Sequence, residues 1–176
     1  GRDFEDPGIP VVLEGTRCNT IAGADLIYSD QPQGVRLLMD HLHSLGHERI
    51  GHVTGLGGSA TIRRQAYARC MEAAGQAPWI VGFSHQTNEE GGSAELLREH
   101  PEVTAVFTAN DTMALGARAA LQETGRRVPH DVSLVGFDNS QLAQSRFLSL
   151  TTVDNHAFDA GIACAEALLR RFAAPD

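Results

Sequence analysis

The stretch VTAVFTANDTMALGARAALQETG, residues 103–125, carries a strand signal and a helix signal with no linker between them. A run rich in β-branched and aromatic residues stops at Asn110 and Asp111, and an Ala-rich run with apolar residues at helical spacing follows at once. A strand that leads directly into a helix is the repeating unit of a parallel α/β sheet. The two short polar side chains then lie at the carboxyl end of a strand, where such sheets hold ligands. The alternative is that Asp111 simply caps the helix.

Strand and helix signals alternate in the same way along the whole chain. The predicted strands are IPVVL (9–13), RIGHVTG (49–55), WIVGFS (79–84), VTAVF (103–107), VSLVGFD (132–138) and LTTV (150–153). The predicted helices start after Asp30, cover TIRRQAYARCMEAAG (61–75) and SAELLREH (93–100), run from Thr112 to Thr124, and end with one that has Ile162, Ala165, Leu168, Leu169 and Phe172 on one side. This alternation predicts an α/β fold with a doubly wound parallel sheet.

Composition and charge exclude several classes of function. The 176 residues include 14 Lys and Arg against 22 Asp and Glu, a net charge of −8, which argues against a nucleic-acid-binding surface. Cys18, Cys70 and Cys164 form no CxxC pair, which argues against a disulfide framework or a zinc site and fits the reduced thiols of a cytoplasmic protein. No apolar run reaches the length of a membrane span, and the opening GRDFEDPG lacks a secretion-signal pattern.

The motifs for cofactor binding or catalysis are weak. GLGGSA (55–60) fits the dinucleotide pattern GxGxxA, but the next predicted strand is followed by His85 and not by the acid that would bind a ribose. No GxSxG nucleophile elbow is present. Four histidines crowd one stretch: His41, His43, His47 and His52. Because Gly46 ends the helix there and no Cys or acidic cluster completes a set, we predict no metal site. From the incomplete dinucleotide pattern and the missing nucleophile elbow we predict no cofactor and no enzymatic activity.

Polar side chains follow four of the predicted strands. They are Ser59 and Arg63, Asn110 and Asp111, Asp138 and Asn139, and Asp154 and Asn155. Each has a plain structural interpretation: Ser59 or Thr61 as a helix cap, Arg63 as a solvated charge, Asp111 as a cap, and Asp138-Asn139 as a turn. Together, fork-shaped Arg, acceptor-only Asp and bifunctional Asn are the groups that hold vicinal hydroxyls or a heterocycle edge. No pair among them forms an evident nucleophile and base, so the set predicts binding and not catalysis.

These segments resemble the effector-binding domain of the lactose-repressor/galactose-repressor (LacI/GalR) family of bacterial transcription regulators. The resemblance covers nearly the whole chain, and its most specific part runs from ANDTMALGA (109–117) through VPHDVSLVGFD (128–138) to LTTV (150–153). It implies a fold like that of type I periplasmic binding proteins, with two α/β subdomains around a ligand cleft. It further implies a truncated chain: mainly the C-terminal subdomain, 29–153, with a remnant of the N-terminal subdomain at 1–28 and a crossover and helix returning to it at 154–176.

The resemblance assigns ligand-binding roles residue by residue. The family's ligand-contacting Arg falls on Arg63, its strand-end Asn on Asn110, and the Asp of its GFD motif on Asp138. The set of implied ligand-binding residues is completed by Tyr28, Ser59 and Asn155. By this interpretation Asn110 faces the ligand, and Asp111 caps the helix. The sequence departs from the family pattern at Gly15, Ala66, Asn155 and SHQTNEEGG (84–92), which leaves the identity of the ligand open.

The implied function is the sensing of a small effector, a sugar or related metabolite, by a cytoplasmic homodimer. Operator DNA would be bound only through a helix-turn-helix that this sequence lacks, and no membrane is involved. A periplasmic sugar-binding protein of an ABC transporter shares the fold and is the alternative; a nucleotide-dependent enzyme would rest on GLGGSA alone. Sequence upstream of Gly1 would separate the first two, because a regulator needs a helix-turn-helix there and a transporter protein needs a secretion signal.

The helix predicted from Thr112 to Thr124 has two different faces. Ala114, Ala117 and Leu121 recur at helical spacing and should face the sheet. Another face mixes apolar and polar residues: Leu115, Arg118 and Gln122. It is either an exposed Ala-rich surface or a contact surface. Since LacI/GalR relatives pair their C-terminal subdomains through this region around a two-fold axis, the resemblance favours a homodimer contact through these three residues.

Overall fold

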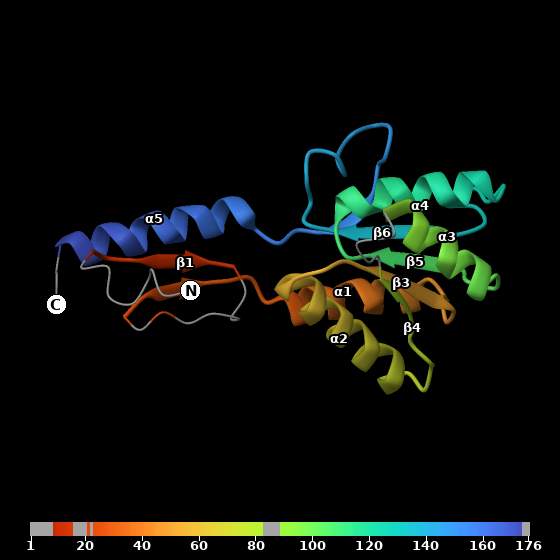
Figure 1. Ribbon diagram of the computed structural model, residues 1–176, viewed down its shortest axis with the longest axis horizontal. Helices are drawn as coiled ribbons and strands as arrows, with labels where there is room; N and C mark the ends of the chain where they lie inside the picture. Colours follow the sequence, from red (N-terminus) through yellow and green to blue (C-terminus); the bar gives the residue numbers. More distant parts are fainter. Residues whose placement is uncertain (1–8, 16–20, 22, 83–88, 174–176) are drawn as a thin grey trace. The chain divides into compact units, whose positions relative to one another are not determined.

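The computed structural model describes residues 9–15, 21, 23–82 and 89–173. The chain forms two compact units (Figure 1). The larger comprises Gln31–Asn155, and the smaller combines Gly1–Asp30 with His156–Asp176. Cys18 and residues 84–88 of the loop that departs from the family pattern lie outside the described residues.

The larger unit is built on a five-stranded sheet with the strand order β4-β3-β5-β6-β7. Its strands are β3 (Ile50–Thr54), β4 (Trp79–Gly82), β5 (Ala105–Thr108), β6 (Ser133–Phe137) and β7 (Thr151–Val153). All of the strand pairs in this sheet are parallel. Every residue of β3 and β5 is buried, as expected for nearly continuous apolar strands that are covered on both faces.

Helices cover both faces of this sheet in two pairs (Figure 1). One pair is α1 (Gln31–Ser44) and α2 (Gly58–Ala73), and the other is α3 (Glu89–Glu99) and α4 (Asp111–Glu123). Each pair encloses a separate apolar core against the strands. Ala114, Ala117 and Leu121 of α4 are buried, as predicted for its sheet-facing side. The prediction of a doubly wound parallel α/β sheet is therefore confirmed.

Two helices begin earlier than the sequence pattern predicts. α2 begins at Gly58 and not at Thr61, and α3 begins at Glu89 and not at Ser93. The residue that precedes α2 is Gly57, with φ 100° and no side-chain cap, a backbone conformation that glycine adopts without strain. Ser59 lies inside the first turn, and the Thr61 hydroxyl donates to the Gly57 carbonyl (3.0 Å). The interpretation of Ser59 or Thr61 as a cap is therefore wrong.

The smaller unit contains a two-stranded parallel sheet, β1 (Val12–Glu14) and β2 (Asp25–Ile27), packed against α5 (Ala157–Ala173). No strand was predicted at β2, because three residues are too few to show a periodic pattern. Arg171 fastens α5 to this sheet by donating to the Gly23 carbonyl, and its Nε lies 3.8 Å from the Asp25 carboxylate.

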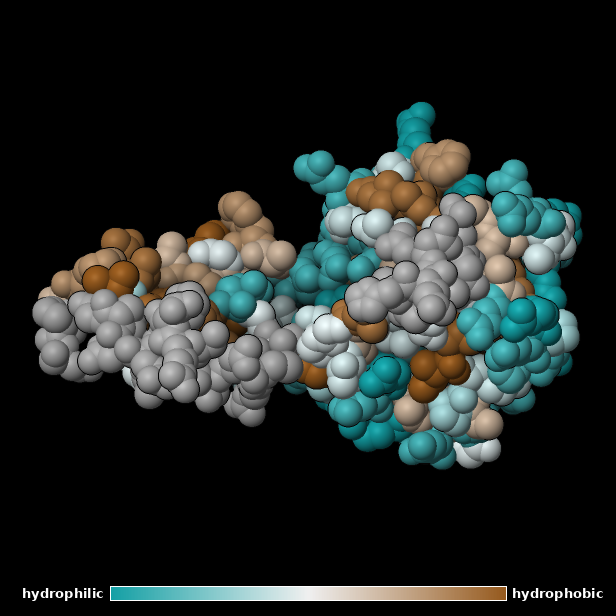
Figure 2. All heavy atoms as spheres, in the orientation of Figure 1, coloured by the Kyte–Doolittle hydropathy of each residue, from teal (hydrophilic) through white to brown (hydrophobic). Residues whose placement is uncertain are grey.

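The apolar side predicted for the last helix is largely exposed in the smaller unit. Ile162, Leu169 and Phe172 all expose more than a third of their surface, and Figure 2 shows the resulting hydrophobic surface along α5. The buried residue of this helix is Ala167. Among the helices of the described ranges, none combines the length and apolarity that crossing a bilayer requires.

A histidine lies at the centre of the larger unit. His52 of β3 is fully buried, with its ring stacked on Phe107 (centroids 4.4 Å apart) and tilted against Tyr67 (5.0 Å). Its Nδ1 lies 3.0 Å from the Phe107 carbonyl oxygen, and its Nε2 has no partner among the described residues. Burial lowers the pKa of His52 to about 4; the bond to Phe107 opposes this only in part, and the charges of Arg64 and Arg63 lower it further.

We expect the free energy of unfolding of the larger unit to fall as the pH decreases from about 6.5 to about 4. The unfolded chain takes up a proton at His52 near the ordinary pKa of 6.5, whereas the folded chain does so only near 4. This contribution is therefore complete above the unfolded pKa and is lost as the pH falls, with a size of roughly 3 kcal/mol. Chemical denaturation at several pH values across this range measures it.

The matched variants are His52→Asn and His130→Asn. Asn at position 52 retains an amide donor for the Phe107 carbonyl but does not titrate, so the loss of stability toward low pH should become smaller. His130 is exposed, and its replacement should leave the wild-type dependence in place. An identical pH dependence in wild type and His52→Asn would contradict the assignment.

Candidate ligand-binding site

Several predicted site residues meet at one edge of the larger unit's sheet, because the carboxyl ends of parallel strands share an edge. Arg63 lies on α2, which follows β3, and Asn110 directly precedes α4, which follows β5. Asp138 comes directly after β6, and Asn155 follows β7. Hydrogen bonds bring Arg63, Asp138 and Asn155 into one cluster.

The Arg63 guanidinium is the centre of this cluster, although its side chain is only 6% exposed. Nη2 donates to Asp138 Oδ1 (2.9 Å), Nε donates to Gln31 Oε1 (2.6 Å), and Nη1 donates to the Ala109 carbonyl. Cζ lies 3.8 Å from the centroid of the Phe137 ring, a cation–π contact. Burial lowers the pKa of Arg63 and nearby carboxylates oppose the shift, but an arginine keeps its charge. The interpretation of Arg63 as a solvated charge is therefore wrong.

Asp138 is held by a sharp bend of the backbone after β6. Its φ is 111°, a conformation that is rare for residues other than glycine, and its N–H donates to the Val153 carbonyl (2.8 Å). Oδ1 accepts from Arg63 and from Asn155 Nδ2 (3.0 Å), while Oδ2 accepts no hydrogen bond from the described residues. Partial burial raises the pKa of Asp138, and the Arg63 charge opposes the shift. The side chain is 35% exposed, so one carboxylate oxygen is left for an incoming donor.

Asn110 and Asp111 have different roles from those expected. Asn110 is the N-cap of α4, and its Oδ1 accepts from the Met113 N–H (2.8 Å). Asp111 is buried, and its carboxylate accepts from the Ser140 N–H (2.7 Å), the Ser140 hydroxyl (2.8 Å) and the Thr152 hydroxyl (2.6 Å). The prediction that Asp111 caps the helix is therefore wrong: Asp111 ties the loop after β6 to β7. The predicted contact of Asn110 with the ligand stays a prediction, and no described residue accepts a hydrogen bond from its Nδ2.

Ser59 and Tyr28 complete the predicted ligand-binding set. Ser59 is half-buried on α2, four residues before Arg63, so both lie on the same face of that helix. Tyr28 belongs to the smaller unit, follows β2 and is partly exposed. Both assignments stay predictions.

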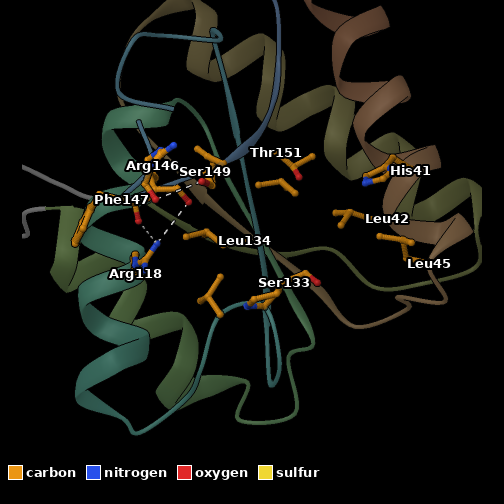
Figure 3. A pocket seen from close by; sticks show the side chains of 15 residues that line it. His41, Leu42, Leu45, Arg118, Ser133, Leu134, Arg146, Phe147, Ser149 and Thr151 are labelled. Atoms are coloured by element: carbon orange, nitrogen blue, oxygen red, sulfur yellow. Dashed lines mark hydrogen bonds between the residues drawn. The ribbon is translucent and has the colours of Figure 1, made fainter. Parts of the chain in front are cut away.

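A hollow of about 500 Å³ lies elsewhere on the larger unit (Figure 3). It is bordered by Leu42 of α1, Leu45 directly after that helix, Leu134 of β6 and Phe147, and none of the predicted ligand-binding residues lines it. Its lining combines these apolar side chains with polar ones such as Arg118 and Arg146.

The three residues predicted for a dimer contact lie on α4, and Arg118 among them lines that hollow. Arg118 Nη1 donates to the Phe147 carbonyl (2.8 Å), and its Cζ lies 4.9 Å from the centroid of the Phe147 ring (Figure 3). Leu115 is half-buried and Gln122 is exposed. Phe147 is 70% exposed, so Arg118 supports an apolar ring at the surface of the larger unit.

Comparison with known proteins identifies the family. The sequence profile of the family described as "Periplasmic binding protein-like domain" matches residues 39–176. A LacI-family transcriptional regulatory protein from Corynebacterium glutamicum has a solved structure with a TM-score of 0.84 and 34% identity, covering 94% of this chain and 64% of that one. The chain belongs to the periplasmic binding protein-like family, in its LacI branch. The predicted LacI/GalR resemblance and the predicted periplasmic-binding-protein-like fold are thereby confirmed.

Two further proteins that are similar to this chain are transcriptional regulators or repressors. The structure titled as the complex of the transcriptional regulator CelR with cellobiose is 29% identical with a TM-score of 0.82, and covers 96% of this chain and 54% of that one. The ribose operon repressor of Halalkalibacterium halodurans is 29% identical over 97% of this chain and 52% of its own length. The LacI-type domain thus spans about half the length of the curated relatives it matches.

Three residues of the LacI-type site were missed by the sequence analysis. Gln31 accepts from Arg63 Nε, Phe137 lies against the guanidinium, and Gly34 lets α1 approach that ring. A Cβ at position 34 would lie 2.7 Å from Phe137 Cζ. Gln31 and Phe137 gave no sequence signal, because their partners are distant in sequence, whereas Gly34 inside a predicted helix could have indicated a close approach.

We expect Asp111→Ala to lower the free energy of unfolding of the larger unit by about 3 kcal/mol or more, since each hydrogen bond to a charged group contributes about 1.5–3 kcal/mol. The substitution leaves three donors from Ser140 and Thr152 without their acceptor. Urea denaturation measures the change. Asp131→Ala is the control, because Asp131 is exposed and its carboxylate bonds to Arg127 alone among the described residues. Equal effects of the two substitutions would contradict the role of Asp111.

Proposed function

We propose that this domain senses a sugar or a related polyhydroxylated metabolite for a LacI-type transcriptional regulator. The observation that carries the proposal is the ion pair between buried Arg63 and half-buried Asp138 at the carboxyl edge of the sheet. Charged groups make the strongest hydrogen bonds to a polar ligand.

The pair offers both kinds of hydrogen-bonding group that a hydroxyl requires. Arg63 has five N–H donors, and three of them are used by Gln31, Ala109 and Asp138. Asp138 Oδ2 is available as an acceptor beside the remaining donors. A hydroxyl group both donates and accepts, so adjacent hydroxyls of a sugar match this arrangement. Asn155, Asn110, Ser59 and Tyr28 would add neutral contacts around the ligand.

The names of the relatives support a sugar. The CelR structure contains cellobiose, another solved LacI-family regulator contains bound ribose, and two curated relatives are ribose operon repressors. We propose the same chemical class for this domain. The number and order of the sugar rings would depend on residues around the Arg63–Asp138 pair.

The relatives also support regulation as the purpose of binding. Several are named as HTH-type regulators or repressors, so we propose that the effector controls operator binding by a helix-turn-helix outside these residues, in the cytoplasm and without catalysis. Effector control is then a shift between two populations with different DNA affinity. The named relatives of this chain are regulators, which is the reason for preferring this function to transport.

We further propose that the domain pairs with a second copy through α4. Leu115 and Gln122 lie on the same helix as Arg118, which contacts the exposed ring of Phe147, and aromatic and arginine side chains are enriched in protein interfaces. The bonds from Arg118 to the carbonyls of Phe147 and Leu148 (2.8 and 3.5 Å) hold this surface in place before any partner binds.

We expect Asp138→Ala and Arg63→Ala each to weaken effector binding by about 1.5–3 kcal/mol, the contribution of a hydrogen bond to a charged group. The measurement is calorimetry on the intact regulator, with an effector first selected from a sugar panel that includes ribose and cellobiose. Asp131→Ala, an exposed aspartate, is the control and should bind normally. Unchanged affinity in both site variants would show that the effector binds elsewhere.

We expect the domain to sediment as a dimer and Leu115→Glu to sediment as a monomer, because a buried, unpaired carboxylate opposes association. Leu37→Glu is the matched control, since Leu37 is a 58% exposed leucine on α1, and this variant should remain a dimer. Analytical ultracentrifugation separates the species. A monomeric wild type, or a dimer that tolerates Leu115→Glu, would refute pairing through this face of α4.

A further inference from the structure

The hollow beside Phe147 combines apolar walls with positive charge. Its volume is about 500 Å³, within the roughly 300–1,000 Å³ that small-molecule sites occupy. Figure 3 shows Leu42 of α1 on one side of the hollow, and Arg118, Arg146 and Phe147 on the other. Leu134 of β6 lies between the two sides. A ligand in this hollow would therefore meet apolar side chains and two guanidinium groups at once.

The charge of this lining is opposite to that of the chain as a whole. The sequence has 22 acidic against 14 basic side chains, a net charge of −8, yet the residues that the structure places around the hollow include no Asp or Glu. Arg118 and Arg146 both line it. Neither guanidinium forms an ion pair with a carboxylate of the described residues. Two neighbouring positive charges without a counter-charge favour an anionic ligand.

Arg118 is held in position by the loop that carries Phe147. Its Nη1 donates to the Phe147 carbonyl (2.8 Å) and to the Leu148 carbonyl (3.5 Å), and its Cζ lies 4.9 Å from the centroid of the Phe147 ring. Nε and Nη2 of Arg118 have no acceptor among the described residues. Two such N–H groups on one planar guanidinium match the two oxygens of a carboxylate.

The apolar side chains of the hollow favour a ligand with an apolar body. Phe147 is 70% exposed and Leu45 is 60% exposed, and both line the hollow. Covering such surface with an apolar group is favourable, whereas hydroxyl groups placed against it would lose their water without gaining partners. This side of the hollow therefore suits an aromatic or aliphatic group better than a sugar.

We propose that the hollow is a second binding site of the larger unit, for a carboxylate carried on an aromatic or aliphatic body. Arg118 and Arg146 bind the carboxylate, and Phe147 and Leu45 contact the apolar body. None of the predicted sugar-binding residues lines the hollow, so the two sites are separate. The second site rests neither on the proposed sugar nor on the proposed pairing through α4.

The test titrates the protein with naphthalene-2-carboxylate and with naphthalene-2-carboxamide, which has the same apolar body but no charge. Backbone amide signals are followed by NMR, which locates the binding site as well as measuring affinity. We expect the carboxylate to shift the signals of residues 133–135 and 147–151 with saturation, and the carboxamide to bind at least tenfold more weakly, because it lacks the charged hydrogen bonds to arginine.

Three variants assign the charge to its side chains. Arg118→Gln and Arg146→Gln should each weaken binding of the carboxylate roughly tenfold or more, the factor for one lost hydrogen bond to a charged group. Arg98→Gln is the matched control, because Arg98 of α3 has a 73% exposed side chain and does not line the hollow. It should bind as the wild type does. Circular dichroism checks that each variant is folded.

Four results would overturn the second site. They are the absence of saturable shifts, equal affinity for the carboxylate and the carboxamide, shifts confined to the exposed apolar side of α5, and equal weakening by Arg98→Gln and the two hollow variants. The Arg146→Gln result keeps the test independent of dimer formation, since Arg146 is not among the residues proposed for pairing. Failure of the sugar panel would leave every expected result of this titration unchanged.

Discussion

A permanent positive charge with almost no access to water sets the main constraint on this domain. The Arg63 side chain is 6% exposed, and a buried charge is tolerated only when it is paired and hydrogen-bonded. Its partners come from the start of α1, the end of β5 and the end of β6. The elements around the sheet edge must therefore keep their positions so that the Arg63 charge stays paired. Because these positions are fixed, the polar groups at this edge are already arranged before any ligand binds.

Asp111 is a second buried charged group whose hydrogen bonds join neighbouring strand ends. Its buried carboxylate accepts three hydrogen bonds from Ser140 and Thr152, and so joins the start of α4 to the loop after β6 and to β7. Gly136 of β6 leaves room for it, because a Cβ there would lie 2.5 Å from Asp111 Oδ1. The site residue Asp138 lies close to the hydrogen bonds of both Arg63 and Asp111. These hydrogen bonds stabilise its backbone at the unusual φ of 111°.

The sequence was sufficient for the fold because the fold depends on local patterns. Apolar strands and amphipathic helices of ordinary length predicted the doubly wound sheet, and the family resemblance identified Arg63, Asp138 and Asn155, which the structure brings together. The roles of Asn110 and Asp111 were not predictable from capping preferences, since both residues cap well; the donors around Asp111 come from distant segments. Gln31 was missed for the same reason, because its partner lies on another helix. Single three-residue strands such as β2 carry no readable period.

The most direct test of the central claim, that the Arg63–Asp138 ion pair is the core of the effector site, is a crystal structure of the domain with the effector of its regulator bound. The account predicts that polar atoms of the ligand lie within hydrogen-bonding distance of Asp138 Oδ2 and of an Arg63 N–H that is not bonded to Gln31, Ala109 or Asp138. A ligand bound with neither Arg63 nor Asp138 in contact, for example in the hollow beside Phe147, would contradict it.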